Sequence, residues 1–405
     1  MNRKFMFWDN PKQAVVFLVV MLIAIGAINI FSASYKDQVS SLFRNYIIFA
    51  GLGGAAAFVL QKLNYRIFLN KRFLIISYGI IFAMLLILFF AHKLPPQLNI
   101  FSSITVTMNG ATRWFDFRIM RLQPSELAKI LTILFGARYL GALLAKNLPV
   151  TLRNKNILGI FAVTCFNGLL VSQQPDWGTA AIIIGLLVGL LLVAGLPMLE
   201  FAFIALLGAI AVCFKYEDYH LERIKVWFDP WSKPLEEGYQ AVQAQLTIGS
   251  GGLIGTKWGE GTFKFFHLPE AHTDFAFAVF CQENGFLGAL VLITVFVVLG
   301  FALARIAVST KNEKGFILVC GVSLFVIGQA AANMAMVCGV LPVIGVPMGF
   351  ISYGGTSLVV NLIAIGLALS VYNDEVAQEK ARSVLEPQER RSGLHVVSRR
   401  WHNDA

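Results

Sequence analysis

Residues 14–34 read AVVFLVVMLIAIGAINIFSAS and contain no charged side chain. A helix that crosses the hydrocarbon core of a bilayer needs about 20 consecutive, mainly apolar residues. The run is too long for the core of a signal peptide, and more such runs follow it, so we expect it to be kept as a membrane helix. This stretch decides the fold class.

The composition of the whole chain agrees with this interpretation. Of the 405 residues, 57% are hydrophobic and 14% are charged, whereas soluble domains carry about 25% charged residues. Ordinary soluble enzymes, disordered chains and secreted disulfide scaffolds are therefore excluded. The five cysteines lack paired metal-ligand spacing, and we interpret them as buried apolar side chains.

Apolar runs of membrane-spanning length recur along the chain, which predicts an all-α fold, a polytopic bundle of about ten transmembrane helices. The predicted spans lie near 14–34, 45–61, 73–92, 126–145, 157–172, 179–195, 199–214, 275–305, 315–340 and 357–373. We expect a short amino terminus over 1–13, a membrane domain over 14–373 and a polar tail over 374–405. A large extracytoplasmic loop, 215–274, lies between the seventh and eighth helices.

The basic residues predict the orientation. The termini and the loops on their side carry more lysine and arginine than the opposite loops do, and basic loops resist translocation. We therefore expect a multi-pass protein of the cytoplasmic membrane with both termini in the cytoplasm. The net charge of +10 partly reflects this bias, so membrane lipids are expected partners and nucleic acid is not.

The predicted fourth span opens with a polar segment, although ionisable residues at membrane depth are costly without a partner or a function. Glu126 follows Pro124 at the helix start, where the helix dipole favours an acid. Lys129 lies three residues further on, on the same helix face. The spacing leaves open whether these two side chains form an internal ion pair or bind a ligand.

Two further charged residues lie on the same predicted side. Arg113 is upstream, and an arginine that converges with Lys129 near the membrane surface would suit a diphosphate. Asp176 follows Pro175 at the start of the sixth span, which repeats the opening of the fourth. Taken alone Asp176 is predicted to cap its helix, but the two helix starts can also face one cavity.

The long loop holds the remaining candidates. It contains Arg223 and a glycine cluster over 248–255, which we interpret as a flexible turn because no strand–turn–helix unit surrounds it. It ends in Glu270, His272 and Asp274, directly before an apolar helix. Partial desolvation there can raise the pKa of a carboxylate and make it a useful base, and Asp274 is our candidate. One histidine with two acids does not specify a metal site.

These motifs together resemble the SEDS family of bacterial membrane proteins (FtsW, RodA and SpoVE). The resemblance rests on segments 109–114, 123–129, 174–179, 238–255, 268–275 and 351–357. The last of these belongs to a turn over 341–357 that we expect to form a re-entrant wall of the cavity. The family implies a ten-helix bundle with its large loop between helices 7 and 8. It also implies peptidoglycan glycosyltransfer, usually alongside a class B penicillin-binding protein.

The resemblance also assigns residues. Asp274 matches the essential loop aspartate of the family, and four residues match the polar lining of its central cavity: Arg113, Glu126, Lys129 and Asp176. To these candidate substrate-binding residues we add Arg223, Glu270 and His272. Most relatives have Gly-Glu-Glu where this chain has Cys281-Gln282-Glu283, so only the second acid is kept. Because the loss of a catalytic acid would impair the chain, we expect the first acid of the relatives to have a structural role.

We therefore expect an enzyme, a peptidoglycan glycosyltransferase that polymerises the polyprenyl-diphosphate-linked precursor lipid II. The alternative is a flippase for lipid II, and a third option is a noncatalytic scaffold. The functional charges gather near the outer half, with Arg138 the main exception. No cofactor is predicted, and a role for a divalent cation is left open. Whether the enzyme acts in cell division, cell elongation or sporulation is also left open.

Overall fold

The computed structural model describes residues 10–33, 39–94, 100–108, 110–117, 121–214, 225–261 and 268–392. Its long helices are α2 (Pro11–Ala33), α3 (Val39–Leu60), α4 (Lys71–Lys93), α5 (Pro124–Leu144), α6 (Lys155–Ser172), α7 (Trp177–Val193), α8 (Met198–Phe214), α10 (Tyr239–Ser250), α12 (Ala276–Ser309), α13 (Glu313–Val337) and α14 (Gly355–Ser392). Two 3-10 helices, η1 (Tyr65–Ile67) and η3 (Pro230–Ser232), lie between them.

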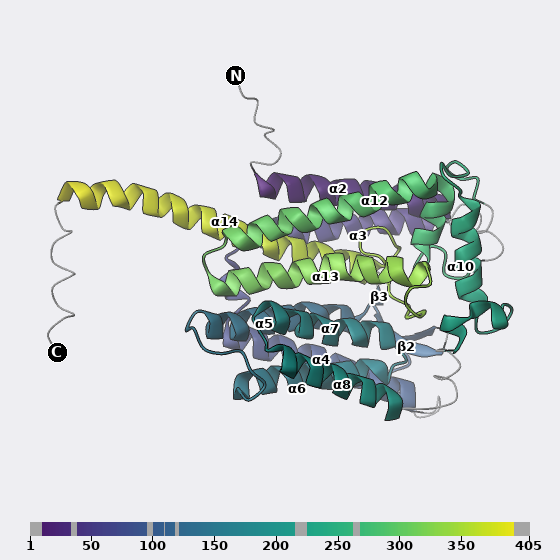
Figure 1. Ribbon diagram of the computed structural model, residues 1–405, viewed down its shortest axis with the longest axis horizontal. Helices are drawn as coiled ribbons and strands as arrows, with labels where there is room; N and C mark the ends of the chain where they lie inside the picture. Colours follow the sequence, from purple (N-terminus) through teal and green to yellow (C-terminus); the bar gives the residue numbers. More distant parts are fainter. Residues whose placement is uncertain are drawn as a thin grey trace, which may run out of the picture.

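Each apolar run identified in the sequence lies on one of these helices. In the described part of the chain, eight helices are long and apolar enough to cross a membrane, and α7 and α8 are apolar but shorter. The prediction of a mainly helical membrane protein is therefore confirmed, whereas the count of ten crossing helices stays a prediction. The helices lie side by side with roughly aligned axes (Figure 1).

The helices form two groups. In the first, α2 and α13 pack on α12, and α3 packs on α14; in the second, α4 to α7 pack on one another. The contact between α13 and α5 joins the two groups. At one end of the bundle α10 lies across the helix ends, and at the opposite end α14 continues well beyond the other helices (Figure 1). The predicted tail therefore begins as a continuation of α14, which runs to Ser392.

A small antiparallel sheet is an addition to the predicted all-helical architecture. It has the order β1 (Thr105–Met108), β2 (Ala111–Asp116) and β3 (Arg121–Leu122). The strands are rich in threonine and aromatic residues, which favour extended backbone. Gly110, with φ of +73°, lies between β1 and β2. The pair Asn109-Gly110 between two such runs is a hairpin signal, and the apolar length that predicts membrane helices does not reveal it.

The glycine cluster of the long loop has a structural partner. Helix α12 is kinked at Gly285, whose φ of 66° and ψ of −170° are not helical. The amide of Phe286 donates to the carbonyl of Gly252 at 2.9 Å, and that of Leu287 to the carbonyl of Leu253 at 3.1 Å. The glycines thus let two backbones meet, where the sequence had suggested only a flexible turn.

The run that departs from the family pattern also lies at this kink. Gln282 is buried and donates to the hydroxyl of Ser250 at 2.8 Å. Glu283 is buried and accepts from the hydroxyl of Ser32 at 2.5 Å. Gln282 thus fastens the loop to α12, and Glu283 fastens α2 to α12. The structural role expected of the first acid, at the position of Gln282, stays a prediction.

Candidate functional site

The candidate residues gather where several chain segments meet at the α10 end of the bundle. Strand β2 carries Arg113, the start of α7 carries Asp176, and the turn before α12 carries Asp274. The segment 338–354 between α13 and α14 joins them, because the amide of Tyr353 donates to the carbonyl of His272 at 2.7 Å. Segments distant in the sequence therefore build one polar region.

A tight turn presents Asp274. The amide of Phe275 donates to the carbonyl of Glu270 at 3.2 Å, and Glu270 itself has a positive φ of 52°. The Glu270 carboxylate accepts from the hydroxyl of Thr273 at 2.6 Å. These local bonds end the long loop immediately before α12 and fix the direction in which the Asp274 side chain leaves the backbone.

Asn333 of α13 fixes the backbone of this turn. Its side-chain amide donates to the carbonyls of Asp274 and Val346, each at 2.7 Å. The Asp274 carboxylate faces Gly345, where an added Cβ would lie 3.4 Å from Oδ2. Within the described part of the chain the carboxylate oxygens of Asp274 accept no hydrogen bond. The backbone is therefore held firmly while the side-chain oxygens stay free to accept a proton.

The surroundings of Asp274 raise the pKa of its carboxyl group from 3.8 to about 7. Burial is the largest cause, and the negative charges of Glu270 and Asp176 add to it, while the positive charge of Arg113 opposes them. These influences show that the four charged residues are electrostatic neighbours. Asp274 can thus exchange a proton near neutral pH, as a general base must.

Arg113 and Asp176 form the second part of the site. Arg113 donates through Nε to the carbonyl of Gln174 at 3.2 Å, also donates to the carbonyl of Pro175, and lies 3.9 Å from Asp176. Asp176 is buried and caps α7 by accepting from the amide of Thr179 at 3.2 Å. The predicted cap is therefore present, and Asp176 also lies close enough to influence Asp274.

Glu126 and Lys129 form an ion pair inside the bundle. Lys129 Nζ lies 2.6 Å from Glu126 Oε1, and the two side chains are 0% and 1% exposed. Lys129 also donates to Gln329 at 2.9 Å, and its ammonium lies 5.2 Å from the centre of the Phe325 ring. Arg113 and Lys129 thus face separate partners, and their joint binding of a diphosphate stays a prediction.

Two residues of the site were not predicted from the sequence. Gln329 and Asn333 are buried on one face of α13, and Gln329 donates to the carbonyl of Pro347 at 2.9 Å. Gln329 therefore links Lys129 to the segment 338–354. Asn333 links the same segment to Asp274. Their only signal in the sequence is a pair of amides spaced i, i+4 in an otherwise apolar helix.

The remaining candidates are less closely tied to Asp274. The ring centres of His272 and Tyr353 are 6.1 Å apart. Burial lowers the pKa of His272, and the charge of Glu270 partly offsets this. Arg223 lies outside the described residues. Among the described residues, no group of three His, Cys, Asp or Glu side chains is arranged to hold a metal ion.

The fold and the site define a class: a polytopic helical membrane protein whose acidic and basic side chains meet at one end of the bundle. Within that class, the chain belongs to the FtsW/RodA/SpoVE family, whose model, described as "Cell cycle protein", matches residues 13–376. The family expected from the sequence motifs is therefore confirmed.

Relatives and solved structures of this family match along most of their length. The chain is 30% identical over 372 residues to the stage V sporulation protein E of Bacillus subtilis, covering 89% of this chain and 97% of the relative. It is 34% identical over 372 residues to a protein of Thiomicrospira cyclica named "Probable peptidoglycan glycosyltransferase FtsW", with coverages of 88% and 90%.

Among solved structures, a chain of a peptidoglycan synthase complex that coordinates polymerization and crosslinking matches with a TM-score of 0.71 and 28% identity, covering 89% of this chain and 97% of that one. The rod shape determining protein RodA of Thermus thermophilus matches with a TM-score of 0.62 and 27% identity, with coverages of 89% and 96%.

Proposed function

We propose that this protein is a peptidoglycan glycosyltransferase that polymerises lipid II into glycan strands. One observation carries the proposal: a carboxylate with free oxygens, Asp274, is tuned to a pKa of about 7 beside Arg113. The relatives named as peptidoglycan glycosyltransferases support the same activity. Asp274 is half-buried, and a carboxylate in such a place with only a structural role would be expected to have its oxygens paired.

In the proposed reaction ionised Asp274 takes the proton from the 4-hydroxyl of the acceptor sugar. The hydroxyl oxygen then forms a bond to the anomeric carbon of the donor chain, and the bond from that carbon to the polyprenyl diphosphate breaks. The anomeric centre is inverted, because attack and departure occur on opposite faces. Arg113 offsets the negative charge that develops on the departing diphosphate.

The remaining residues support this step. The Glu126–Lys129 pair and Gln329 position the segment 338–354, and Asp176 holds the start of α7 and keeps the pKa of Asp274 high. Glu270 shapes the turn that presents the base, and with His272 and Arg223 it is proposed to contact the substrate. The proposal requires no cofactor, and a divalent cation bound by the substrate diphosphate is compatible with it.

The reaction places this end of the bundle outside the cell. We propose that the protein spans the bacterial cytoplasmic membrane with both termini in the cytoplasm, with the membrane domain over 14–373 and the tail over 374–405. The match to a chain of a peptidoglycan synthase complex supports a class B penicillin-binding protein as its partner. Lipid II would lie with its chain among membrane lipids and its sugars in the polar region.

The test is a polymerisation assay with the purified full-length protein and lipid II, with and without a class B penicillin-binding protein. We expect glycan strands, in greater yield when the partner is present. The alternative, a lipid II flippase, predicts movement of lipid II across vesicle membranes without any new glycosidic bond. Transport without polymer under both conditions would therefore overturn the proposal.

A further inference from the structure

A basic cavity lies at the opposite end of the bundle, away from the Asp274 region. Its volume is about 860 Å³, and it opens between the start of α4, the end of α5 and the turn from α12 to α13. Its charged lining consists of five basic side chains and one acid: Arg66, Lys71, Arg138, Lys311, Lys314 and Glu313.

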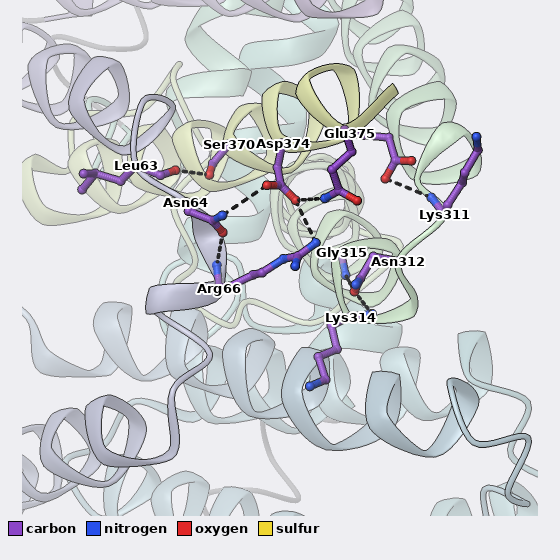
Figure 2. Close-up of polar contacts among 11 residues, drawn as sticks. Leu63, Asn64, Arg66, Lys311, Asn312, Lys314, Gly315, Ser370, Asp374 and Glu375 are labelled. Carbon is purple, nitrogen blue, oxygen red and sulfur yellow. Dashed lines mark hydrogen bonds and ion pairs between the residues drawn. The ribbon is translucent and has the colours of Figure 1, made fainter. Parts of the chain in front are cut away.

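Among the described residues, a carboxylate neutralises just one of these basic side chains. Arg66 forms an ion pair with Asp374 of α14 at 3.1 Å, and Figure 2 shows Lys314 pointing away from this contact. In the described part of the chain, Lys71, Arg138, Lys311 and Lys314 have no ion-pair partner. The cavity therefore keeps an excess of positive charge.

Two helix starts lie at this cavity. Helix α4 begins at Lys71 with its amino terminus capped by Asn70, and α13 begins at Glu313 with Asn312 as its cap. Each helix start carries a partial positive charge, which favours anions. The ends of α5 and α12 contribute the opposite partial charge and Glu313 a full negative charge, but these are outweighed once the four cations without an ion-pair partner in the described residues are added to the two helix starts.

The position and depth of the basic groups indicate what kind of anion fits. Arg138 is half-buried one to two turns before the end of α5, where it donates to the carbonyl of Leu69, whereas Lys71 and Lys311 are exposed at the rim. The cavity thus runs from the surface down to the level at which membrane helices end. Basic pockets between transmembrane helices at this level suit the headgroups of anionic lipids.

We propose that this cavity binds a phosphate-bearing anion, supplied either by the headgroup of an anionic phospholipid or by a soluble phosphorylated molecule. Phosphate oxygens match both the fork of Arg138 and the point charges of the lysines. A volume of about 860 Å³ falls in the range of ligand sites and exceeds what a single inorganic ion fills. This site is separate from the proposed glycan chemistry.

The test compares two double variants of the full-length protein purified in detergent. Lys71→Gln with Lys311→Gln removes two exposed charges from the rim of the cavity. Arg153→Gln with Lys155→Gln removes two exposed charges at the start of α6, at the same end of the bundle but outside the cavity. The thermal unfolding midpoint is followed during titration with phosphatidylglycerol, phosphatidylcholine or sodium pyrophosphate, which yields apparent dissociation constants.

Each basic side chain near an anionic surface contributes a factor of about five to binding, so the cavity variant should bind about 25-fold more weakly than the wild type. The control variant should bind as the wild type does. A response to phosphatidylglycerol alone identifies a lipid headgroup as the source, and a response to pyrophosphate identifies a soluble phosphate. Equal weakening in both variants, or no response to either anion, would overturn the proposal. No arm depends on polymerisation activity.

Discussion

At the scale of single residues, the main chemical prediction is that the pKa of Asp274 sets the pH dependence of the reaction. A general base works in its ionised form, so a pKa of about 7 makes kcat/KM fall about tenfold for each pH unit below that value and level off above it. An aspartate of ordinary pKa would give a flat profile across the same range. The initial polymerisation rate of the wild type, measured between about pH 5 and pH 8, distinguishes the two.

A matched variant tests the cause of this shift. Glu270→Gln removes a negative charge that raises the pKa of Asp274, yet keeps an oxygen that can accept from Thr273. The midpoint of the profile should therefore move to lower pH. An unchanged or higher midpoint would show that Glu270 has no electrostatic influence on the base.

The Glu126–Lys129 pair gives a second expectation. Lys129→Met leaves a buried carboxylate without its partner, which costs about 3–5 kcal/mol in the free energy of unfolding. Glu126→Gln with Lys129→Met removes both charges and should recover most of the stability and activity. Thermal unfolding and polymerisation assays of the single and double variants measure this. Activity that stays lost while stability returns would assign Lys129 to the substrate.

At the scale of elements, the kink of α12 depends on Gly285. Gly285 has a φ of 66°, which glycine adopts readily and other residues adopt rarely. A Cβ at this position would collide with the backbone at Gly255. We expect Gly285→Ala to lower the free energy of unfolding by at least about 1–3 kcal/mol. Gly300→Ala, in the same helix and with nothing closer than 3.6 Å to its added Cβ, should be nearly neutral. Equal unfolding midpoints for the two variants would contradict this account.

The elements also show what the sequence can and cannot predict. Runs such as 14–34 identify membrane helices because the bilayer imposes length and apolarity on each helix separately. The place of Asp274 before an apolar helix makes it a candidate base from sequence alone, and the cap formed by Asp176 follows from the capping preference of its position. The contacts of Asn333 with Asp274 and Val346 could not be predicted, because they depend on how separate helices pack. The basic cavity could not be predicted from the sequence either, because its lining combines residues of several separate segments.

At the scale of the whole molecule, the proposed chemistry requires the α10 end to face outwards. In a background without the five native cysteines, Ser232→Cys should react with a membrane-impermeant thiol reagent in intact cells. Ser309→Cys, at the end of α12, should react only after the membrane is opened. Both serines are exposed, so access to the side chain does not bias the comparison. The reverse pattern would place Asp274 in the cytoplasm.

The central claim is that Asp274 is the base of a glycan polymerase, and the most direct measurement compares two aspartates of the same region. Asp274→Asn and Asp229→Asn make the same chemical change, but Asp229 is exposed near η3. With lipid II and the partner present, we expect Asp274→Asn to reduce the polymerisation rate by at least about a hundredfold. Asp229→Asn should retain the wild-type rate. A wild-type polymer yield from folded, membrane-inserted Asp274→Asn protein would contradict the account.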